Sequence, residues 1–302
     1  MTTRMLKEIR EQPEVLGRIL DEGWTEVLSA ARNLRERNIR FAMLAARGTS
    51  DNAALYAKYL FEVILGIPTA LASPSAFTLY ESKMKLDDVL VIGISQSGES
   101  KDVLETVRRS GELGASTVSV TNDQTSSLAE SAEHHFFLRA GEEESVAATK
   151  TYTAELLVLY LLAEALNGAG APNENVVKLP DQARELLESA WKGTERYRYA
   201  DHLVVTSRGY NLPTAQEAAL KLMETNYVVA EAFSAADLRH GPDPTGRRSA
   251  RRVGRPVRSA RAGRAAVPRD GRWRADRAHA PLPRSHPTAL AGDPRGAALP
   301  EG

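Results

Sequence analysis

Hydrophobic residues along the chain alternate between short apolar runs and longer stretches in which they recur every three or four positions. The short runs predict buried strands, and the longer stretches predict helices. Strands are predicted at 40–46, 68–72, 88–94, 116–121, 135–139 and 202–207. Helices are predicted at 51–65, 75–81, 100–113, 126–131, 148–166, 179–191 and 212–223. Strands separated by helices of this length predict an α/β fold, a parallel sheet covered by helices on both faces.

The same pattern suggests how the chain is divided. Residues 1–36 predict two helices, and Pro13 fits the first turn of the second one. Residues 37–192 form the first subdomain, and residues 193–243 begin a second. The strand, glycine-containing turn and helix at 202–223 repeat the order at 40–60, which is weak support for an internal duplication.

Composition excludes several classes of protein. The 302 residues include 39 basic and 39 acidic residues and no cysteine. The absence of cysteine excludes disulfides, a thiolate nucleophile and zinc sites with Cys ligands. The longest apolar stretch, 156–162, is far shorter than the about 20 residues that span a membrane, and residues 1–20 contain no signal-peptide core. We therefore expect a cytoplasmic protein with no membrane partner.

The balanced charge hides a difference between the two ends of the chain. Residues 244–302 contain 14 arginines and four acidic residues, a net charge of +10, whereas residues 1–243 carry −10. The segment has eight prolines, a single aromatic residue, Trp273, and no lysine. It is too poor in large apolar residues to form a core, so we expect it to be disordered. A nucleic-acid-binding arm is the alternative, but the lack of Lys and aromatics disfavours it, and no nucleic-acid partner is expected.

Two loops at the ends of predicted strands are rich in hydroxyls. Gly48-Thr49-Ser50 and Ser95-Gln96-Ser97-Gly98-Glu99-Ser100 both precede helices. Free N–H groups at a helix N-terminus favour an anion, and Ser and Thr add donors. One such loop is an ordinary N-cap, whereas two on one sheet favour a ligand site. Neither loop has the spacing of a nucleotide-binding motif, so a compact phosphate on a small molecule fits better.

A third segment, residues 142–150, precedes a long predicted helix. Its acidic triplet, residues 142–144, is typical of a solvated loop. The small residues around Val146 and Ala147 would let the backbone approach a ligand, although this signal is weak alone.

A fourth segment places Glu217, Lys221 and Glu224 on one helix face. A surface ion pair explains this spacing, at a few tenths of a kcal/mol. The helix is also apolar enough to be largely buried, where a carboxylate would need a task. His240 precedes a Gly-Pro turn, and an imidazole suits proton transfer near neutrality.

Taken together, the motifs resemble the sugar isomerase (SIS) family. The chain is similar to the isomerase half of glutamine–fructose-6-phosphate amidotransferases and to stand-alone amino-sugar-phosphate deaminases and isomerases. The resemblance covers about residues 5–242 and rests on these segments in order: Lys7-Glu-Ile-x-Glu-Gln-Pro13, Gly48–Ser50, Ser95–Ser100, Val146–Lys150, Glu217-x-x-x-Lys221-x-x-Glu224 and Glu231-x7-Arg239-His-Gly-Pro242.

The resemblance implies a three-layer α/β/α SIS fold with two tandem subdomains and an active site shared across a homodimer. It implies no metal and no cofactor. The sugar phosphate would be held by Thr49, Ser50, Ser95, Gln96, Ser97 and Ser100. Backbone around Val146 and Ala147 would line the sugar. Glu224 would move a proton between C1 and C2, His240 of the neighbouring subunit would assist ring opening, and Lys221 would steady the site.

Departures from the family shape the expected function. The chain has neither a glutaminase half nor its Cys nucleophile, and no Lys follows Lys221 to form a Schiff base. We therefore expect a deaminase or isomerase that converts a hexosamine 6-phosphate to the ketose phosphate and ammonia. A glucosamine-6-phosphate synthase type without its glutaminase domain and a non-catalytic regulatory sugar-phosphate-binding module are the alternatives.

The end of the chain departs from the family as well. The family continues past His-Gly-Pro with further strands and helices, whereas this chain continues with the arginine-rich residues 244–302. We expect the second subdomain to be truncated, and one hypothesis is that residues from about Asp243 onward are translated out of frame.

Overall fold

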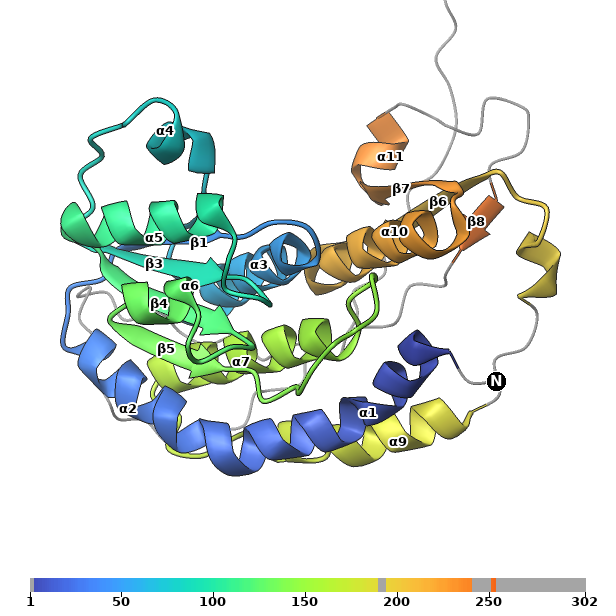
Figure 1. Ribbon diagram of the computed structural model, residues 1–302, viewed down its shortest axis with the longest axis horizontal. Helices are drawn as coiled ribbons and strands as arrows, with labels where there is room; N and C mark the ends of the chain where they lie inside the picture. The colour runs from blue at the N-terminus through green and yellow to red at the C-terminus, as the bar shows by residue number, and fades with distance from the viewer. Residues whose placement is uncertain (1–2, 190–193, 241–250, 254–302) are drawn as a thin grey trace, which may run out of the picture.

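The computed structural model describes residues 3–189, 194–240 and 251–253 (Figure 1). The longer helices are α1 (Arg4–Arg18), α2 (Trp24–Arg35), α3 (Thr49–Leu60), α5 (Lys101–Glu112), α7 (Lys150–Leu166), α9 (Leu179–Glu188) and α10 (Leu212–Asn226). The short helices are α4 (Pro74–Thr78), α6 (Ser127–Ser131), α8 (Glu174–Val177) and α11 (Asp237–His240). The strands are β1 (Phe41–Ala45), β2 (Thr69–Leu71), β3 (Val89–Ile94), β4 (Ser116–Thr121), β5 (His134–Phe137), β6 (His202–Ser207), β7 (Val229–Ser234) and β8 (Arg251–Val253).

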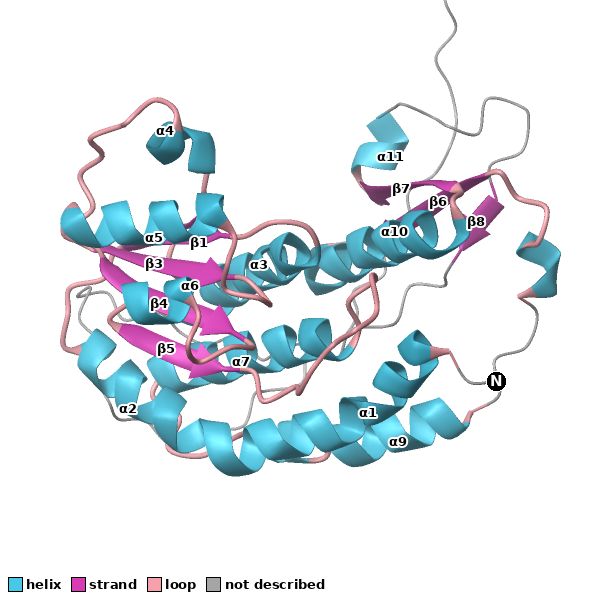
Figure 2. Ribbon diagram, viewed as in Figure 1, coloured by secondary structure: helices cyan, strands magenta, loops and turns pink. Residues whose placement is uncertain are grey.

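The first five strands form one parallel sheet in the order β2-β1-β3-β4-β5. In register, Leu44 of β1 lies opposite Leu71 of β2 and Ile92 of β3. Every residue of β3 and β4 is buried, as expected for central strands covered on both faces. The predicted α/β fold is therefore confirmed, with helices on both sides of the sheet (Figure 2).

The two faces of the sheet pack different helices. Leu44, Ile92 and Val120 face a large core that includes residues of α1, α2, α3 and α7. Val91 faces a smaller core formed with α4, α5 and α6, in which Phe77 is fully buried. Both cores are made mostly of aliphatic side chains spaced at the strand and helix periods, so burial explains why the sequence pattern predicts this part of the fold.

The N-terminal helices break at a different point from the predicted one. Helix α1 continues through Pro13, which lies inside it and is buried. The break follows at Ile19–Gly23, a π-helical turn that leads directly into α2. The prediction that Pro13 begins the second helix is therefore wrong, because burial of Val15 and Leu16 in the large core, where α1 packs on α7, extends the first helix past the proline.

A second, smaller parallel sheet has the order β7-β6-β8. Helix α10 connects β6 to β7, and a small core lies between them, built from Leu203, Val205, Ala215, Ala219 and Ala230. The predicted strand at 202–207 is β6, whereas β7 was not predicted. Of residues 244–302, the structure describes only β8, so the predicted disorder and frame shift otherwise fall outside the described residues. The described helices include none that is long and apolar enough to cross a membrane.

Candidate active site

The two hydroxyl-rich loops lie at the same edge of the first sheet. Residues 46–50 follow β1 and residues 95–100 follow β3, and these two strands are neighbours. An ion pair of 2.7 Å between Arg47 Nη2 and Asp102 Oδ2 joins the first segment to α5, the helix that follows the second. The carboxyl ends of adjacent parallel strands are where ligands bind in such folds. The structure therefore brings the two predicted loops together.

Gly98 fixes the shape of the second loop. Its φ is +69°, and its N–H donates to Ser95 Oγ at 3.2 Å. A Cβ at this position would overlap the Ser126 side chain, the N-cap of α6. The Gly98 carbonyl in turn accepts from Leu128 N at 3.1 Å. Only glycine fits this close approach between the loop and α6.

Two of the three serines of the loop, Ser97 and Ser100, are at least partly exposed, whereas Ser95 is buried. Ser97 is exposed, and its Oγ accepts from Glu99 N at 3.3 Å. Ser100 is the N-cap residue of α5 but its side chain makes no capping bond. Within the described residues, neither hydroxyl donates a hydrogen bond to the protein. Together with Gln96, which is half-buried, they can offer donors to an anion at the N-terminus of α5.

Thr49 has a different environment. Its hydroxyl donates to Glu217 Oε1 at 3.1 Å and accepts from Lys221 Nζ at 3.1 Å. The second Glu217 oxygen accepts from Asn52 Nδ2 at 2.7 Å. Glu217 is only 5% exposed, so the surface ion pair that its spacing suggested is instead a buried contact between α3 and α10.

Lys221 lies between two carboxylates of α10. Its Nζ is 3.2 Å from Glu217 Oε1 and 2.7 Å from Glu224 Oε2. The cluster has one cation and two anions when all three are ionised, so it would repel a phosphate. Of the predicted residues, Thr49, Lys221 and Glu224 are thus brought together in a group suited to proton transfer rather than to anion binding.

Ser50 is buried and donates to Glu155 Oε1 of α7 at 2.7 Å. Burial raises the pKa of Glu155 to about 8, and Glu217 and Glu143 add to the rise, while the Ser50 bond opposes it. A hydroxyl has a single proton to donate, so in this arrangement Ser50 and Thr49 have none left for a phosphate. Of the hydroxyls in the two loops, those left without an acceptor among the described residues therefore lie in the 95–100 loop.

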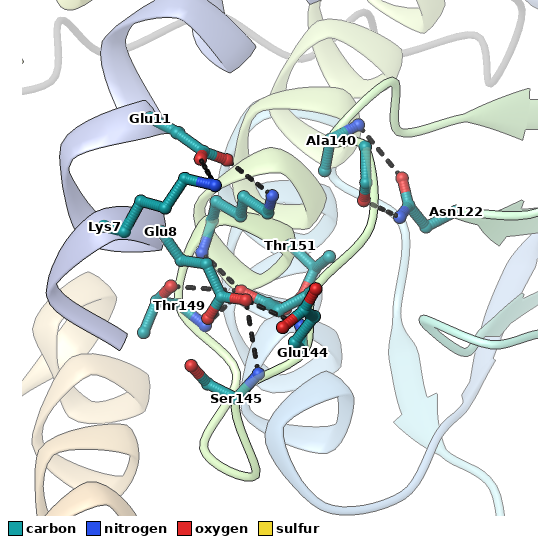
Figure 3. Close-up of polar contacts among 12 residues, drawn as sticks. Lys7, Glu8, Glu11, Asn122, Ala140, Glu144, Ser145, Thr149 and Thr151 are labelled. Atoms are coloured by element: carbon teal, nitrogen blue, oxygen red, sulfur yellow. Dashed lines mark hydrogen bonds and ion pairs between the residues drawn. The ribbon is translucent and has the colours of Figure 1, made fainter. Parts of the chain in front are cut away.

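The third predicted segment forms a loop between β5 and α7. Asn122 anchors its start, since Oδ1 accepts from Ala140 N at 2.9 Å and Nδ2 donates to Gly141 O at 2.7 Å (Figure 3). The backbone N–H of Asn122 donates to Gln96 O, which links this loop to the 95–100 loop. Val146 is 95% exposed, whereas Ala147 is buried.

The side chain of Glu143, near the start of this loop, reaches the N-terminus of α7. Its Oε1 accepts from the backbone N–H groups of Thr149 and Lys150 at 2.8 and 2.9 Å. The side chains of Thr149 and Thr151 also donate to this carboxylate. The expectation that residues 142–144 form a solvated loop is therefore wrong for Glu143, because the helix N-terminus supplies it with donors.

Some site residues were missed and one is less fully described. Asn52, Glu143 and Glu155 were not predicted, because an acidic or amide residue on a helix or in a loop carries no sequence signal of its partner in the fold. His240 is the last residue of α11, and its side chain lies outside the described part of the structure. Its role in ring opening therefore remains a prediction. Among the described residues, no three His, Cys, Asp or Glu side chains are grouped as a metal site would require.

Comparison with known proteins places this site in a family. A family model described as SIS domain matches residues 34–165. The chain is 38% identical over 243 residues to a glutamine–fructose-6-phosphate aminotransferase [isomerizing] of Methanothermobacter thermautotrophicus, covering 79% of this chain and 40% of that protein. The chain thus spans about two fifths of the length of the curated relatives it matches.

Solved structures agree with this match. A candidate phosphosugar isomerase from Silicibacter pomeroyi superposes with a TM-score of 0.76 at 36% identity, over 80% of this chain and 74% of that one. The C-terminal domain of a glucosamine–fructose-6-phosphate aminotransferase from Francisella tularensis superposes with a TM-score of 0.66 at 28% identity, over 80% and 72%. The parallel sheet, its hydroxyl-rich loops and these matches show that the chain belongs to the SIS domain family.

Proposed function

We propose that this chain acts on a hexosamine 6-phosphate and converts it to the ketose phosphate and ammonia. The observation that carries the proposal is the contact of Lys221 Nζ with both Glu224 and Thr49 beside the hydroxyl-rich loops. It supports a carboxylate held next to a phosphate subsite. The family and the printed names of its relatives support a sugar phosphate as ligand.

The charge distribution supports a definite orientation of the substrate. Hydroxyl donors without an acceptor in the described part of the chain lie at Ser97 and Ser100, whereas the carboxylates lie at Glu217 and Glu224. A phosphate dianion binds to the first group and is repelled by the second. The phosphate therefore holds one end of the sugar while C1 and C2 lie near Glu224, and its binding energy positions the reacting carbons.

The proposed chemistry is a proton transfer followed by hydrolysis. Glu224 removes the proton from C2 of the open-chain aldose, which gives an enolamine. Return of a proton to C1 gives the C2 imine, and water converts this imine to the ketone with release of ammonia. Lys221 keeps the Glu224 carboxylate oriented through the ion pair. His240, from a second copy of the chain, would assist ring opening.

The reverse direction is the second candidate. The curated relative that is 38% identical is named an isomerizing aminotransferase. This name favours the amination of fructose 6-phosphate over the release of ammonia from the amino sugar. A regulatory module that binds the sugar phosphate without turnover remains the non-enzymatic alternative, because such a module needs the hydroxyl loops and not Glu224.

The test compares two variants that separate binding from turnover. Glu224→Gln should lower ammonia release from glucosamine 6-phosphate by about 10²-fold or more and leave binding of the sugar phosphate unchanged. Ser97→Ala should weaken binding about tenfold, because a donor to the phosphate is lost. Glu36→Gln, an exposed carboxylate after α2, is the matched control. Ammonia release and calorimetric titration give the two readings.

Each outcome has a distinct meaning. Binding without ammonia release in the unmodified chain would contradict the deaminase and favour the regulatory module. Formation of glucosamine 6-phosphate from fructose 6-phosphate and ammonia as the dominant reaction would favour the amination direction. Equal activity of Glu224→Gln and the unmodified chain would remove Glu224 from the mechanism.

A further inference from the structure

Glu8 of α1 is a buried carboxylate that the proposed chemistry does not use. It is 4% exposed, and its Oε1 accepts from the backbone N–H groups of Glu144 at 2.6 Å and Ser145 at 3.2 Å (Figure 3). Its Oε2 is buried without a hydrogen-bond partner among the described residues. Burial opposes ionisation, and the hydrogen bonds from Ser145 and Glu144 outweigh it, so the pKa of Glu8 is below its ordinary value.

A second contact joins the same two segments. Lys150, the first residue of α7, is 3% exposed, and its Nζ is 2.7 Å from Glu11 Oε2, one turn after Glu8 (Figure 3). A buried ammonium is stable only with such a partner. Helix α1 thus binds the loop before α7 through Glu8 and the start of α7 through Glu11.

These contacts determine how the 141–149 loop is held. The loop contains no helix or strand, so its N–H groups need partners from elsewhere. Asn122 holds residues 140–141, Glu8 holds residues 144–145, and Glu143 caps α7. Val146 lies between these fixed points with its side chain exposed.

We propose that Glu8 is a positioning residue for the sugar, acting through the backbone of the 141–149 loop. The inference rests on the proposed function in one respect, the assignment of Val146 and Ala147 to the sugar. Glu8 accepts the two amides that immediately precede Val146, and this fixes the direction in which the Val146 and Ala147 backbone faces the substrate. The Lys7–Pro13 motif therefore contributes to the site from outside the residues matched by the SIS domain model.

The buried charge argues against a role in stability alone. An apolar side chain of similar size would fill the same space without the cost of burying an ionised group. Two amides at the turn of a loop, however, need an acceptor, and a carboxylate binds both through charge-assisted bonds. The gain is a fixed loop conformation rather than a more stable helix contact.

The test uses the full chain with Glu8→Gln, Glu8→Ala and the control Glu14→Gln. Glu14 lies on the same helix, and its side chain is exposed. Hydrogen exchange of the amides of residues 142–149 reads the loop directly. Exchange at residues 144 and 145 should rise about tenfold in Glu8→Ala and less in Glu8→Gln, whose amide oxygen still accepts.

Affinity measurements then test whether the loop contributes to binding of the sugar. The affinity for fructose 6-phosphate should fall about tenfold in Glu8→Ala, whereas the affinity for inorganic phosphate, held by the 95–100 loop, should not change. Glu14→Gln should change neither. If Glu8→Ala does not fold, Glu11→Gln replaces it as the test variant, because it removes the ionic partner of Lys150 and so disturbs the end of the same loop.

The outcomes separate this inference from the proposed function. Unchanged exchange at residues 144 and 145 in both Glu8 variants overturns the positioning role. Raised exchange with unchanged affinity for fructose 6-phosphate also overturns it, because the loop would then not touch the sugar. An equal loss of affinity for both ligands indicates a general structural effect and overturns it as well. Failure of the unmodified chain to bind fructose 6-phosphate contradicts the proposed function itself, whereas the exchange result still reports on the loop.

Discussion

At the scale of the residue, two glycines of the hydroxyl-rich loops show how the backbone constrains the site. Gly48 and Gly98 have φ values of +60° and +69°, a region that side chains disfavour. Their surroundings differ, since a Cβ at Gly48 would meet nothing within 4 Å, whereas one at Gly98 would overlap Ser126. The pair therefore separates conformational strain from steric overlap.

Substitution of each glycine by alanine measures these two effects. Gly48→Ala should lower the free energy of unfolding by about 1–3 kcal/mol, because its φ of +60° and ψ of −131° lie in a region that is open mainly to glycine. Gly98→Ala should lower it further, because α6 must also move. Urea denaturation measures both. Equal losses would show that the close approach of the 95–100 loop to α6 does not hold in solution.

At the scale of the element, α7 combines an almost entirely buried apolar surface with one buried carboxyl group. Glu155 is 1% exposed, and its Oε2 has no hydrogen-bond partner among the described residues. Its only hydrogen bond there is the one from Ser50 on α3. Because burial raises its pKa, Glu155 ties the packing of α3 against α7 to pH.

The raised pKa of Glu155 predicts a pH-dependent stability. The folded pKa of about 8 exceeds the ordinary value of 4.5, so the unfolded chain loses the proton first as the pH rises. The contribution of Glu155 is therefore most favourable below pH 4.5 and becomes less favourable from there to about pH 8. Glu155→Gln keeps an acceptor for Ser50 and removes this loss. Its melting temperature relative to the unmodified chain should therefore increase from pH 5 to pH 8.

A matched variant controls for other titrating groups. Glu188→Gln changes an exposed carboxylate of α9 and should follow the unmodified chain at every pH. A constant difference in melting temperature between Glu155→Gln and the unmodified chain from pH 5 to pH 8 would show that Glu155 ionises normally in the folded protein.

At the scale of the whole molecule, α10 joins the small second sheet to the first one. It packs on β6 and β7 through the small core and lies against α3 near the N-terminus of that helix (Figure 1). Glu217 supplies the polar part of this interface, since it accepts from Thr49 and Asn52 and pairs with Lys221. The proposed base, Glu224, therefore reaches the first sheet only through the placement of α10.

Glu217→Ala should loosen this connection. It leaves Asn52 and Lys221 without their shared partner and should lower the free energy of unfolding on the order of 2 kcal/mol. Hydrogen exchange should rise in α10 and β6 and remain unchanged in β3 and β4. Thr214→Ala, at an exposed position of α10, is the control. Uniform change across both sheets would indicate that Glu217 does not act at the interface specifically.

The sequence predicted the elements that have a strong local signal. The fully buried strands β3 and β4 and the apolar helix α7 agree with their predicted ranges to within two residues, since burial imposes a hydrophobic period on neighbouring residues. Pro13 shows the limit of this reasoning, because packing of Val15 and Leu16 extends α1 past a residue that usually starts a helix.

By itself, the sequence determined the alternation of strands and helices, the two hydroxyl-rich loops and the carboxylates of α10, because each is written in residues that are close in the chain. Only the tertiary structure decided which groups meet. It paired Thr49 with Glu217, Ser50 with Glu155, and Glu8 with the amides of Glu144 and Ser145. These partners lie more than a hundred positions apart. Hydrogen bonds act over about 3 Å, so such contacts follow from the packing of helices on a sheet and leave no periodic trace in the sequence.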